Sequence, residues 1–461
     1  MLDRGITRRI KTGQKGSDFM CKRRLRNLTT IIAAIALAGT LAACGNDTGS
    51  SASSKADSSV SASAESSQTT SAKSDSKEET STTTHTSNSE ATPTSANVSS
   101  TGAIDASELF TERDLEQTAD LSEAKTCTVS DGQTIEITEE GVYVIEGTAS
   151  NAEIIINAAD EDKVQLVLSG VSITNDSQPA IYVKNADKVF ITTSSGTENT
   201  LSVTGTFTED GDTNTDAVIF SKDDIVLSGQ GILNINSTDN GISGKDDMKV
   251  TGGTINITAA DAALEVNDGI AIADGTINIT TSGDGLHAEN DDDNSQGWVY
   301  ICGGTLNIQS QDDGIHATTI AQFDGGTVSI TAAEGIEGTW IQMNDGTIEI
   351  NATDDGINAG NKSSSYTVAA EINGGSLTIN MGQGDTDAID SNGNLAITGG
   401  TLNINAQSPF DYDGTLTHTG GTIYVNGTET TEITSQMMGG GMGGGIDGGM
   451  GGGRMGGPGG H

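Results

Sequence analysis

The sequence predicts an all-β protein, a right-handed single-stranded parallel β-helix, and three observations lead to this fold. A glycine followed by a strand that alternates apolar and polar residues returns through the second half of the chain, at Gly231, Gly253, Gly275, Gly304, Gly326, Gly346, Gly375, Gly400 and Gly421. Most repeats also hold a second motif, in which Asp, Glu or Asn precedes Gly and then Ile or Leu, followed by a third short apolar run. Aromatic residues make up 3% of the chain, too few for a conventional globular core, whereas a solenoid can be filled by Ile, Val, Leu and Ala.

The spacing of the repeats defines coils of about 20–22 residues. Successive repeat glycines are 22, 22, 29, 22, 20, 29, 25 and 21 residues apart, so some coils carry insertions. Three short strands cannot enclose a core alone, but stacked coils can, because each strand pairs with its equivalent in the next coil, about 4.8 Å away. Crossovers between parallel strands are nearly always right-handed. A nine-residue calcium-binding roll is excluded, because its Gly-Gly-x-Gly-x-Asp period does not occur.

The chain is strongly acidic. Its 461 residues include 22 Lys and Arg against 64 Asp and Glu, a formal net charge of −42. Such a charge argues against nucleic acid or an anionic membrane surface as a partner and favours cations.

Residues 1–43 carry the features of an export signal. Four basic residues between positions 22 and 26 precede an apolar run over residues 28–42. The Leu-Ala-Ala-Cys sequence that ends this run resembles a bacterial lipoprotein signal, in which Cys44 is lipidated and becomes the mature N-terminus. The run is short for the alternative, an ordinary transmembrane anchor. Met20 stands where such a signal usually begins, and is an alternative start of translation.

Two segments are expected to be disordered. Residues 44–104 are a Ser/Thr-rich stretch without apolar periodicity, typical of a flexible stalk, and residues 436–461 are a tail dominated by Gly and Met. A lipid anchor and a stalk together place the protein at the extracellular face of the cell membrane, reaching into the cell surface.

The folded part is expected over residues 105–435, with irregular N-terminal cap coils over residues 105–205. That first part holds strands without the clean glycine repeat, as terminal coils of a solenoid must. Cys127 and Cys302 fall within the folded part and either pair as a disulfide or remain free thiols.

Acidic residues recur at the second motif, so stacking places carboxylates on successive coils. Carboxylates at that distance repel unless they take up protons or cations, and hard oxygen ligands suit Ca²⁺. The candidate calcium ligands are Asp284, Asp312, Asp313, Glu334, Asp354, Asp355 and Asp387. The alternative is that Asp-Gly pairs are only turn formers at the corners of the coils.

The residue that follows the Ile or Leu of this motif is expected to point outward, and in successive coils these residues form a second column. It comprises Glu265, His287, His316, Glu337, Asn358 and Asp390. Two of the five histidines of the chain fall here on consecutive coils, so the row could hold a metal or donate hydrogen bonds to a polymer. A solvated polar face is the alternative.

The two tryptophans, Trp298 and Trp340, also have an outward phase. They lie two coils apart, about 10 Å, with Ile320 in the coil between them. That spacing suits stacking on alternate sugars of a β-linked glycan. Packing beneath an inserted loop, such as residues 289–297, is the alternative.

The sequence contains no established catalytic or phosphate-binding motif. A calcium-dependent lyase on this fold would need Arg or Lys as a strong base, yet no arginine lies between Arg113 and Arg454. Lys222, Lys245 and Lys249 remain as candidates, although charge compensation is the simpler explanation of a lysine column beside an aspartate column.

The exported chain as a whole resembles the bacterial carbohydrate-binding β-helix lipoproteins. The resemblance rests on the lipoprotein signal, the stalk, the repeated Lys-Asp-Asp steps and the tail, and above all on EGI at 334–336 and DDGIN at 354–358. It implies a pectate-lyase-like architecture, calcium binding and a cellulose- or pectin-type polysaccharide as ligand. The DAALE sequence at 261–265 departs from the pattern, which puts a ligand set at that coil in doubt.

These observations favour a monomeric, non-catalytic, calcium-stabilised lipoprotein that binds polysaccharide, with Trp298, Trp340, His287, His316, Glu337 and Asn358 as glycan contacts. A calcium-dependent uronate lyase is the enzyme alternative. A surface adhesin or structural wall protein is the other.

Overall fold

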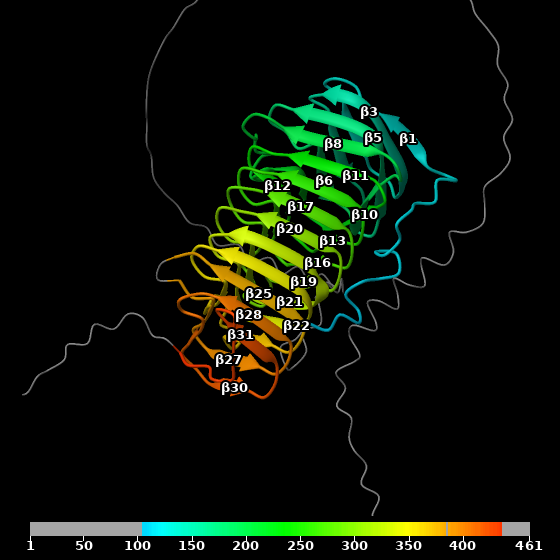
Figure 1. Ribbon diagram of the computed structural model, residues 1–461. Coiled ribbons are helices and arrows are strands. Elements are labelled where there is room, and N and C mark those ends of the chain that lie inside the picture. The colour runs from blue at the N-terminus through cyan, green and yellow to red at the C-terminus, as the bar shows by residue number, and fades with distance from the viewer. Residues whose placement is uncertain (1–103, 384–385, 436–461) are drawn as a thin grey trace, which may run out of the picture. The chain divides into compact units, whose positions relative to one another are not determined.

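The computed structural model describes residues 104–383 and 386–435, which contain 32 strands and no helix (Figure 1). The all-β part of the prediction is therefore confirmed. The proposed signal peptide, Cys44 and the tail lie outside the described residues. Within the described ranges no helix is long and apolar enough to span a bilayer.

Each turn of the chain contributes three strands, and each strand pairs in parallel with its equivalent in the next turn. The pairings form three ladders. Ladder A contains β8 (Glu198–Val203), β11 (Ile232–Asn236), β14 (Thr254–Thr258), β17 (Thr276–Thr280), β20 (Thr305–Gln309), β25 (Ser376–Met381), β28 (Thr401–Asn405) and β31 (Thr422–Val425).

Ladder B carries the second sequence motif. Its strands are β2 (Thr134–Ile137), β4 (Glu153–Asn157), β6 (Ile181–Asn185), β9 (Ala217–Ser221), β12 (Asn240–Gly244), β15 (Leu264–Val266), β18 (Leu286–Ala288), β23 (Ile357–Ala359), β26 (Ile389–Ser391) and β29 (Asp411–Tyr412).

Ladder C carries the third apolar run. Its strands are β1 (Lys125–Thr128), β7 (Lys188–Thr193), β10 (Asp224–Gly229), β13 (Met248–Val250), β16 (Gly269–Ile272), β19 (Trp298–Ile301), β24 (Ala369–Ile372), β27 (Asn394–Ile397) and β30 (Leu416–His418).

Longer strands continue from one ladder into the next. They are β3 (Gly141–Ser150), β5 (Lys163–Asn175), β21 (Ile315–Ala332) and β22 (Ile336–Ala352). The last strand, β32 (Thr428–Thr430), is antiparallel to β31 and ends the stack.

The repeats pair as their spacing predicts. Between β14 and β17, Thr254 pairs with Thr276, and each following residue keeps that register. Alternate residues such as Ile255 and Ile277 point inward and are almost fully buried, in one apolar cluster that follows the turns. Alternation with period two thus sends one set of side chains to the core and the other outward.

The repeat glycine precedes the ladder A strand for a conformational reason. Gly304 has a φ of 78°, in the left-handed region. A Cβ at this position would also lie 2.9 Å from the carbonyl oxygen of Gly275, in the turn before. Both the backbone angle and the close approach of adjacent turns exclude a side chain here.

Residues 104–117 do not form a three-stranded coil of the repeat. They lie along ladder C instead, and we call this segment the N-terminal strap. Ile104 bonds to Gln322 of β21, with 2.6 Å between its amide nitrogen and the Gln322 Oε1. Gln117, at the other end, donates to the carbonyl of Thr251 at 2.9 Å and accepts from the amide of Gly229 at 3.1 Å. The first turn therefore begins at β1, not at residue 105.

A second apolar cluster lies between the strap and ladder C, separate from the central core. The strap contributes buried residues including Leu109 and Phe110, and ladder C contributes Trp298, Tyr300 and Ile320. Outward-facing aromatic residues are thus covered by a segment almost two hundred positions earlier in the sequence.

Candidate functional site

The outward column of ladder B forms as expected. Strand register aligns Glu265 with His287, His287 with His316, His316 with Glu337, Glu337 with Asn358, and Asn358 with Asp390, so that consecutive turns present them side by side. In the short strands β18 and β23 the middle residue is half-exposed and its two neighbours are buried. The column continues through Asp411 in β29. We call this set of residues the ladder B column.

Two imidazole rings stack at the centre of the column. The centroids of His287 and His316 lie 4.7 Å apart, with 14° between the ring planes. The Nδ1 atom of His287 lies 2.6 Å from Asp284 Oδ2, and the Nδ1 atom of His316 lies 3.2 Å from Asp313 Oδ2. Each histidine therefore faces the acidic residue that begins its own motif.

His316 and Glu337 belong to a chain of alternating charges. The Nδ1 atom of His316 lies 2.8 Å from Glu337 Oε2, and Lys362 Nζ lies 2.6 Å from Glu337 Oε1. Burial lowers the pKa of His316, but its hydrogen bonds to Asp313 and Glu337 outweigh this and raise it to about 10. Burial raises the pKa of Glu337, but His316 and Lys362 overcome that effect and hold it at about 2. At neutral pH the group is a fixed set of ions.

The acidic residues of the motif also stack on consecutive turns. Backbone amides connect them: Gly314 N donates to Glu334 O at 2.8 Å, and Gly335 N donates to Asp355 O at 2.8 Å. The pKa of Glu334 is raised to about 7 by burial and by neighbouring carboxylates, against the opposing hydrogen bond from Asn358. Burial and neighbouring carboxylates also raise the pKa of Asp355 to about 6. These acids are crowded and poorly compensated.

Three overlapping groups in the described residues bring possible metal ligands within 4.8 Å of one another. Asp284, Asp312 and Asp313 form a group of oxygen donors only, which fits Ca²⁺. The other two groups add imidazole nitrogen from His287 or His316 and so fit calcium less well.

The remaining predicted calcium ligands are arranged differently. Glu334, Asp354, Asp355 and Asp387 are not brought into such a group within the described part of the chain. Asp354 is exposed, and one oxygen of Asp355 already accepts the amide of Asp387 at 3.0 Å. Sequence spacing alone did not distinguish the two halves of the acidic column.

The two tryptophans do not form an open platform, which corrects their predicted role. Trp298 is 1% exposed and lies against Gly269, where an added Cβ would fall 2.0 Å from a ring atom. Its Nε1 donates to Gln296 at 3.2 Å. Trp340 is half-buried beside the same cluster, and its Nε1 is buried without a hydrogen-bond partner among the residues that the structure describes. The strap and the local packing occupy the space that a sugar ring would need.

The candidate lyase bases have other partners. Lys249 is buried with its Nζ 3.7 Å from Asp114 of the strap, and Lys245 lies over the ring of Phe220, 5.7 Å from its centroid. Lys222 donates to Thr213 at 2.9 Å. Cys127 carries a free thiol, so it does not pair with Cys302.

Lys362 is the site residue that sequence reasoning missed. It lies in the insertion between the repeat glycines Gly346 and Gly375, which are 29 residues apart. That insertion was the only signal, because residues in an insertion have no register in the repeat.

A family model described as "Carbohydrate-binding domain-containing protein" matches residues 131–385 and 333–435. A protein of that same description from Acetivibrio thermocellus is 38% identical over 122 residues, which are 26% of this chain and 43% of the relative. The match therefore spans less than half of that relative's length. A solved structure titled as a polysaccharide lyase-like protein from C. thermocellum, a gadolinium derivative, shares 28% identity, covers 51% of this chain and 96% of its own, and has a TM-score of 0.41.

Proposed function

The chain belongs to the carbohydrate-binding domain-containing family, and on this premise we propose that it binds a polysaccharide without cleaving it. The observation that carries the proposal is the ladder B column, an unbroken row of hydrogen-bonding side chains on consecutive turns. Its repeat of about 4.8 Å per turn suits a ligand that is itself an extended polymer. The glycan contacts are His287, His316, Glu337 and Asn358.

A binding role is favoured over a lyase role by the charge state of the column. Two cationic groups, His316 within the column and Lys362 beside it, are each held by Glu337. Burial lowers the pKa of Lys362, but the hydrogen bond to Glu337 outweighs it and leaves the pKa above its ordinary value. A protonated lysine cannot act as the base that removes a proton from a uronate.

Calcium is part of the proposal. Asp284, Asp312 and Asp313 would hold the ion, which would neutralise their mutual repulsion and fix the corner beside His287. Water or backbone oxygens would complete its coordination, because calcium takes six to eight oxygen ligands.

The anchoring and the finer fold are proposed on sequence grounds. The lipoprotein signal supports a lipid-anchored monomer at the extracellular face of the cell membrane, with Cys44 as the lipidated residue. The near-universal handedness of parallel crossovers supports a right-handed, pectate-lyase-like β-helix.

Retention of the purified protein on insoluble cellulose and on immobilised polygalacturonate, with calcium or with chelator, tests the function. We expect retention on at least one polymer, and about tenfold weaker retention for Asn358→Ala. His418→Ala, in β30 away from the column, is the matched control and should bind as wild type. Retention on neither polymer would favour the adhesin. Release of unsaturated uronate, seen as ultraviolet absorbance, would identify a lyase.

A further inference from the structure

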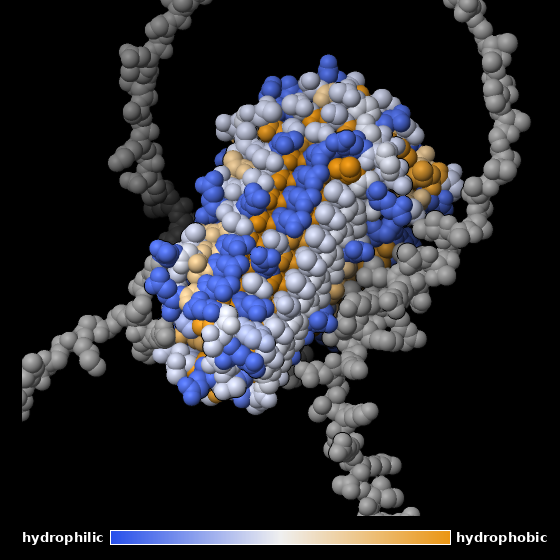
Figure 2. All heavy atoms as spheres, in the orientation of Figure 1, coloured by the Kyte–Doolittle hydropathy of each residue, from blue (hydrophilic) through white to orange (hydrophobic). Residues whose placement is uncertain are grey.

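The outward face of ladder A is almost free of charge, in a chain with 64 acidic residues. From β11 to β31 its three outward columns hold Thr, Ser, Asn and Gln with few exceptions. The only charged residue in these columns is Glu349. Figure 2 shows a hydrophilic row running along the stack on the face where Figure 1 labels β11, β17 and β20. Such a face offers hydrogen bonds without attracting ions.

Asparagines of the middle column bond to one another from turn to turn. Asn256 donates to Asn234, Asn278 to Asn256, and Asn307 to Asn278, each at 2.8 Å. Each link uses one amide hydrogen and one lone pair, so the side chains are held in place while some capacity remains toward solvent. The middle column is therefore held in place from β11 to β20, and the face as a whole is polar.

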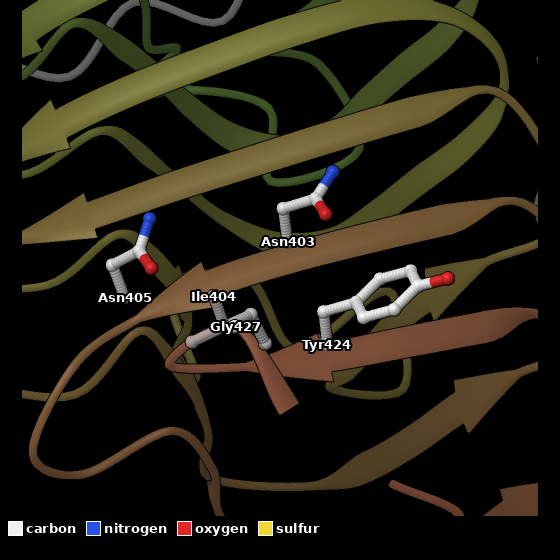
Figure 3. A pocket seen from close by; sticks show the side chains of 5 residues that line it. All are labelled: Asn403, Ile404, Asn405, Tyr424 and Gly427. Carbon is white, nitrogen blue, oxygen red and sulfur yellow. The ribbon is translucent and has the colours of Figure 1, made fainter. Parts of the chain in front are cut away.

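At the end of the stack, the outward face of ladder A holds a cavity of about 240 Å³. It is lined by Asn403, Ile404, Asn405, Tyr424 and Gly427 (Figure 3). The side chains of Asn403 and Tyr424 form no hydrogen bond among the described residues. Asn405 uses its side-chain amide to donate to Asn380 at 2.7 Å, and its side-chain oxygen accepts no hydrogen bond from another described residue. The cavity thus combines an aromatic ring with unused donors and acceptors.

The geometry of the cavity is fixed by the hairpin that ends the stack. Asn426 and Gly427 connect β31 to β32 and both have positive φ, 51° and 75°, as a two-residue hairpin turn requires. The side chain of Asn426 donates to the backbone carbonyl of Ala406 at 2.9 Å, and this bond connects the hairpin to the preceding coil of the stack. Tyr424 is therefore presented by an anchored strand.

We infer that this cavity, the Tyr424 pocket, is a subsite for one sugar ring of a neutral polysaccharide that lies along the outward face of ladder A. The inference rests on the proposed function and adds to it a second contact surface and a ligand class. Sugar rings place C–H groups against aromatic faces and hydroxyl groups against amides, which Tyr424, Asn403 and Asn405 supply. An acidic polymer would find no cationic partner, since the three columns contain no Lys, Arg or His from β11 to β31.

Binding of the full chain to cellulose, as the neutral polymer, and to polygalacturonate tests this site. Tyr424→Ala should weaken retention on cellulose about tenfold and leave any retention on polygalacturonate unchanged. Asn403→Ala should weaken it about fivefold, and this variant should keep the fold, because the Asn403 side chain forms no hydrogen bond to another described residue and the alanine keeps the backbone pairing of β28. Tyr424→Phe distinguishes the contribution of the aromatic ring from that of the hydroxyl group. Tyr366→Ala is the matched control, because it removes an aromatic side chain that packs beside the second apolar cluster.

The outcomes separate the two claims. Wild-type retention on cellulose that neither Tyr424→Ala nor Asn403→Ala weakens overturns the subsite and leaves the proposed function standing. Retention on polygalacturonate alone overturns the neutral class of the ligand. Retention on neither polymer overturns both claims.

Discussion

At the scale of single residues, charge along ladder B is compensated unevenly. Glu337 pairs with two cations, His316 at 2.8 Å and Lys362 at 2.6 Å. Glu334 and Asp355, on the same side of the stack, form no ion pair among the described residues. The first group stabilises the fold in its ionised form, whereas the second opposes folding when it ionises.

The pH dependence of stability should follow from these acids. The pKa of Glu334 is raised from 4.5 to about 7 in the folded state, and that of Asp355 from 3.8 to about 6. The folded state therefore binds more protons than the unfolded state between these values, and stability falls as pH rises. Without calcium, we expect the thermal midpoint to decline by several degrees from about pH 4 to about pH 7, as measured by circular dichroism.

Glu334→Gln provides the control for this decline. It keeps the side chain's size and its hydrogen-bonding oxygen for Asn358 but cannot ionise, so the midpoint should fall less steeply over the same window. His316 acts in the same direction at higher pH, because its pKa is raised from 6.5 to about 10 and the stability this adds is lost progressively as pH rises between these values. A midpoint that rises between about pH 4 and pH 7 in wild type would contradict the assigned crowding.

The sequence predicted the ladder B column but not the fate of the tryptophans. Register in a repeat follows from spacing, so His287 and His316 were placed correctly side by side. Spacing also gives Trp298 an outward phase, but it carries no information on which distant segment covers an outward residue. Here the cover comes from residues 104–117, whose own pattern has no repeat.

At the scale of elements, the group of Asp284, Asp312 and Asp313 leads to a prediction about calcium. A bound ion stabilises the fold by about 2.7 kcal/mol at a hundredfold excess over Kd, so millimolar calcium should raise the thermal midpoint. Asp312→Asn with Asp313→Asn should remove most of that rise, because these residues share a group with Asp284. Magnesium should substitute poorly, since it demands a tighter octahedral site.

Asp354→Asn with Asp355→Asn is the matched comparison, because it makes the same change of charge. Among the described residues, Asp354 and Asp355 belong to no group of three possible metal ligands. We expect this variant to keep its response to calcium. Equal responses of wild type and both double variants would show that these acids are turn formers and that the ion binds elsewhere.

The N-terminal strap offers a second prediction at this scale. Asp114 is 1% exposed, and its two oxygens lie 3.7 Å from Lys188 and Lys249 respectively. Asp114→Ala leaves the buried Lys249 and the half-buried Lys188 less compensated, and breaking a buried ion pair costs about 3 kcal/mol or more. Urea unfolding measures this loss, and Glu112→Ala, an exposed acid two residues earlier, should change stability little. Equal effects of the two changes would mean that the strap contributes no specific stability.

At the scale of the whole molecule, the repeating part of the fold could be predicted because local and long-range signals coincide in it. The same glycine that permits the left-handed backbone also permits the close approach of adjacent turns, so its recurrence marks the stack. The strap, Lys362 and the Tyr424 pocket lie where the repeat stops or is interrupted. Their positions depend on contacts between segments far apart in the sequence, which a period does not encode.

The proposed anchoring is tested on the whole cell. Cys44→Ala removes the thiol that would carry the lipid, so the protein should be released from the membrane fraction or remain unprocessed. Cell fractionation followed by immunoblotting measures this, with Cys127→Ala as the control for loss of a thiol. Unchanged membrane retention of the Cys44 variant would reject the lipid anchor.

The path of the strap has a mechanical consequence. From Ile104 at β21, the strap passes Phe110 beside Tyr300 of β19 and ends with Gln117 at the carbonyl that follows β13, so it runs opposite to the order in which turns are added. A pulling force applied through the preceding chain would act on these contacts one at a time, beginning at Ile104. Contacts that break one at a time yield at a lower force than contacts that share the force. The strap would therefore peel from its Ile104 end before any turn unwinds. Peeling would expose the aromatic surface around Trp298 while the stack of strands remained intact.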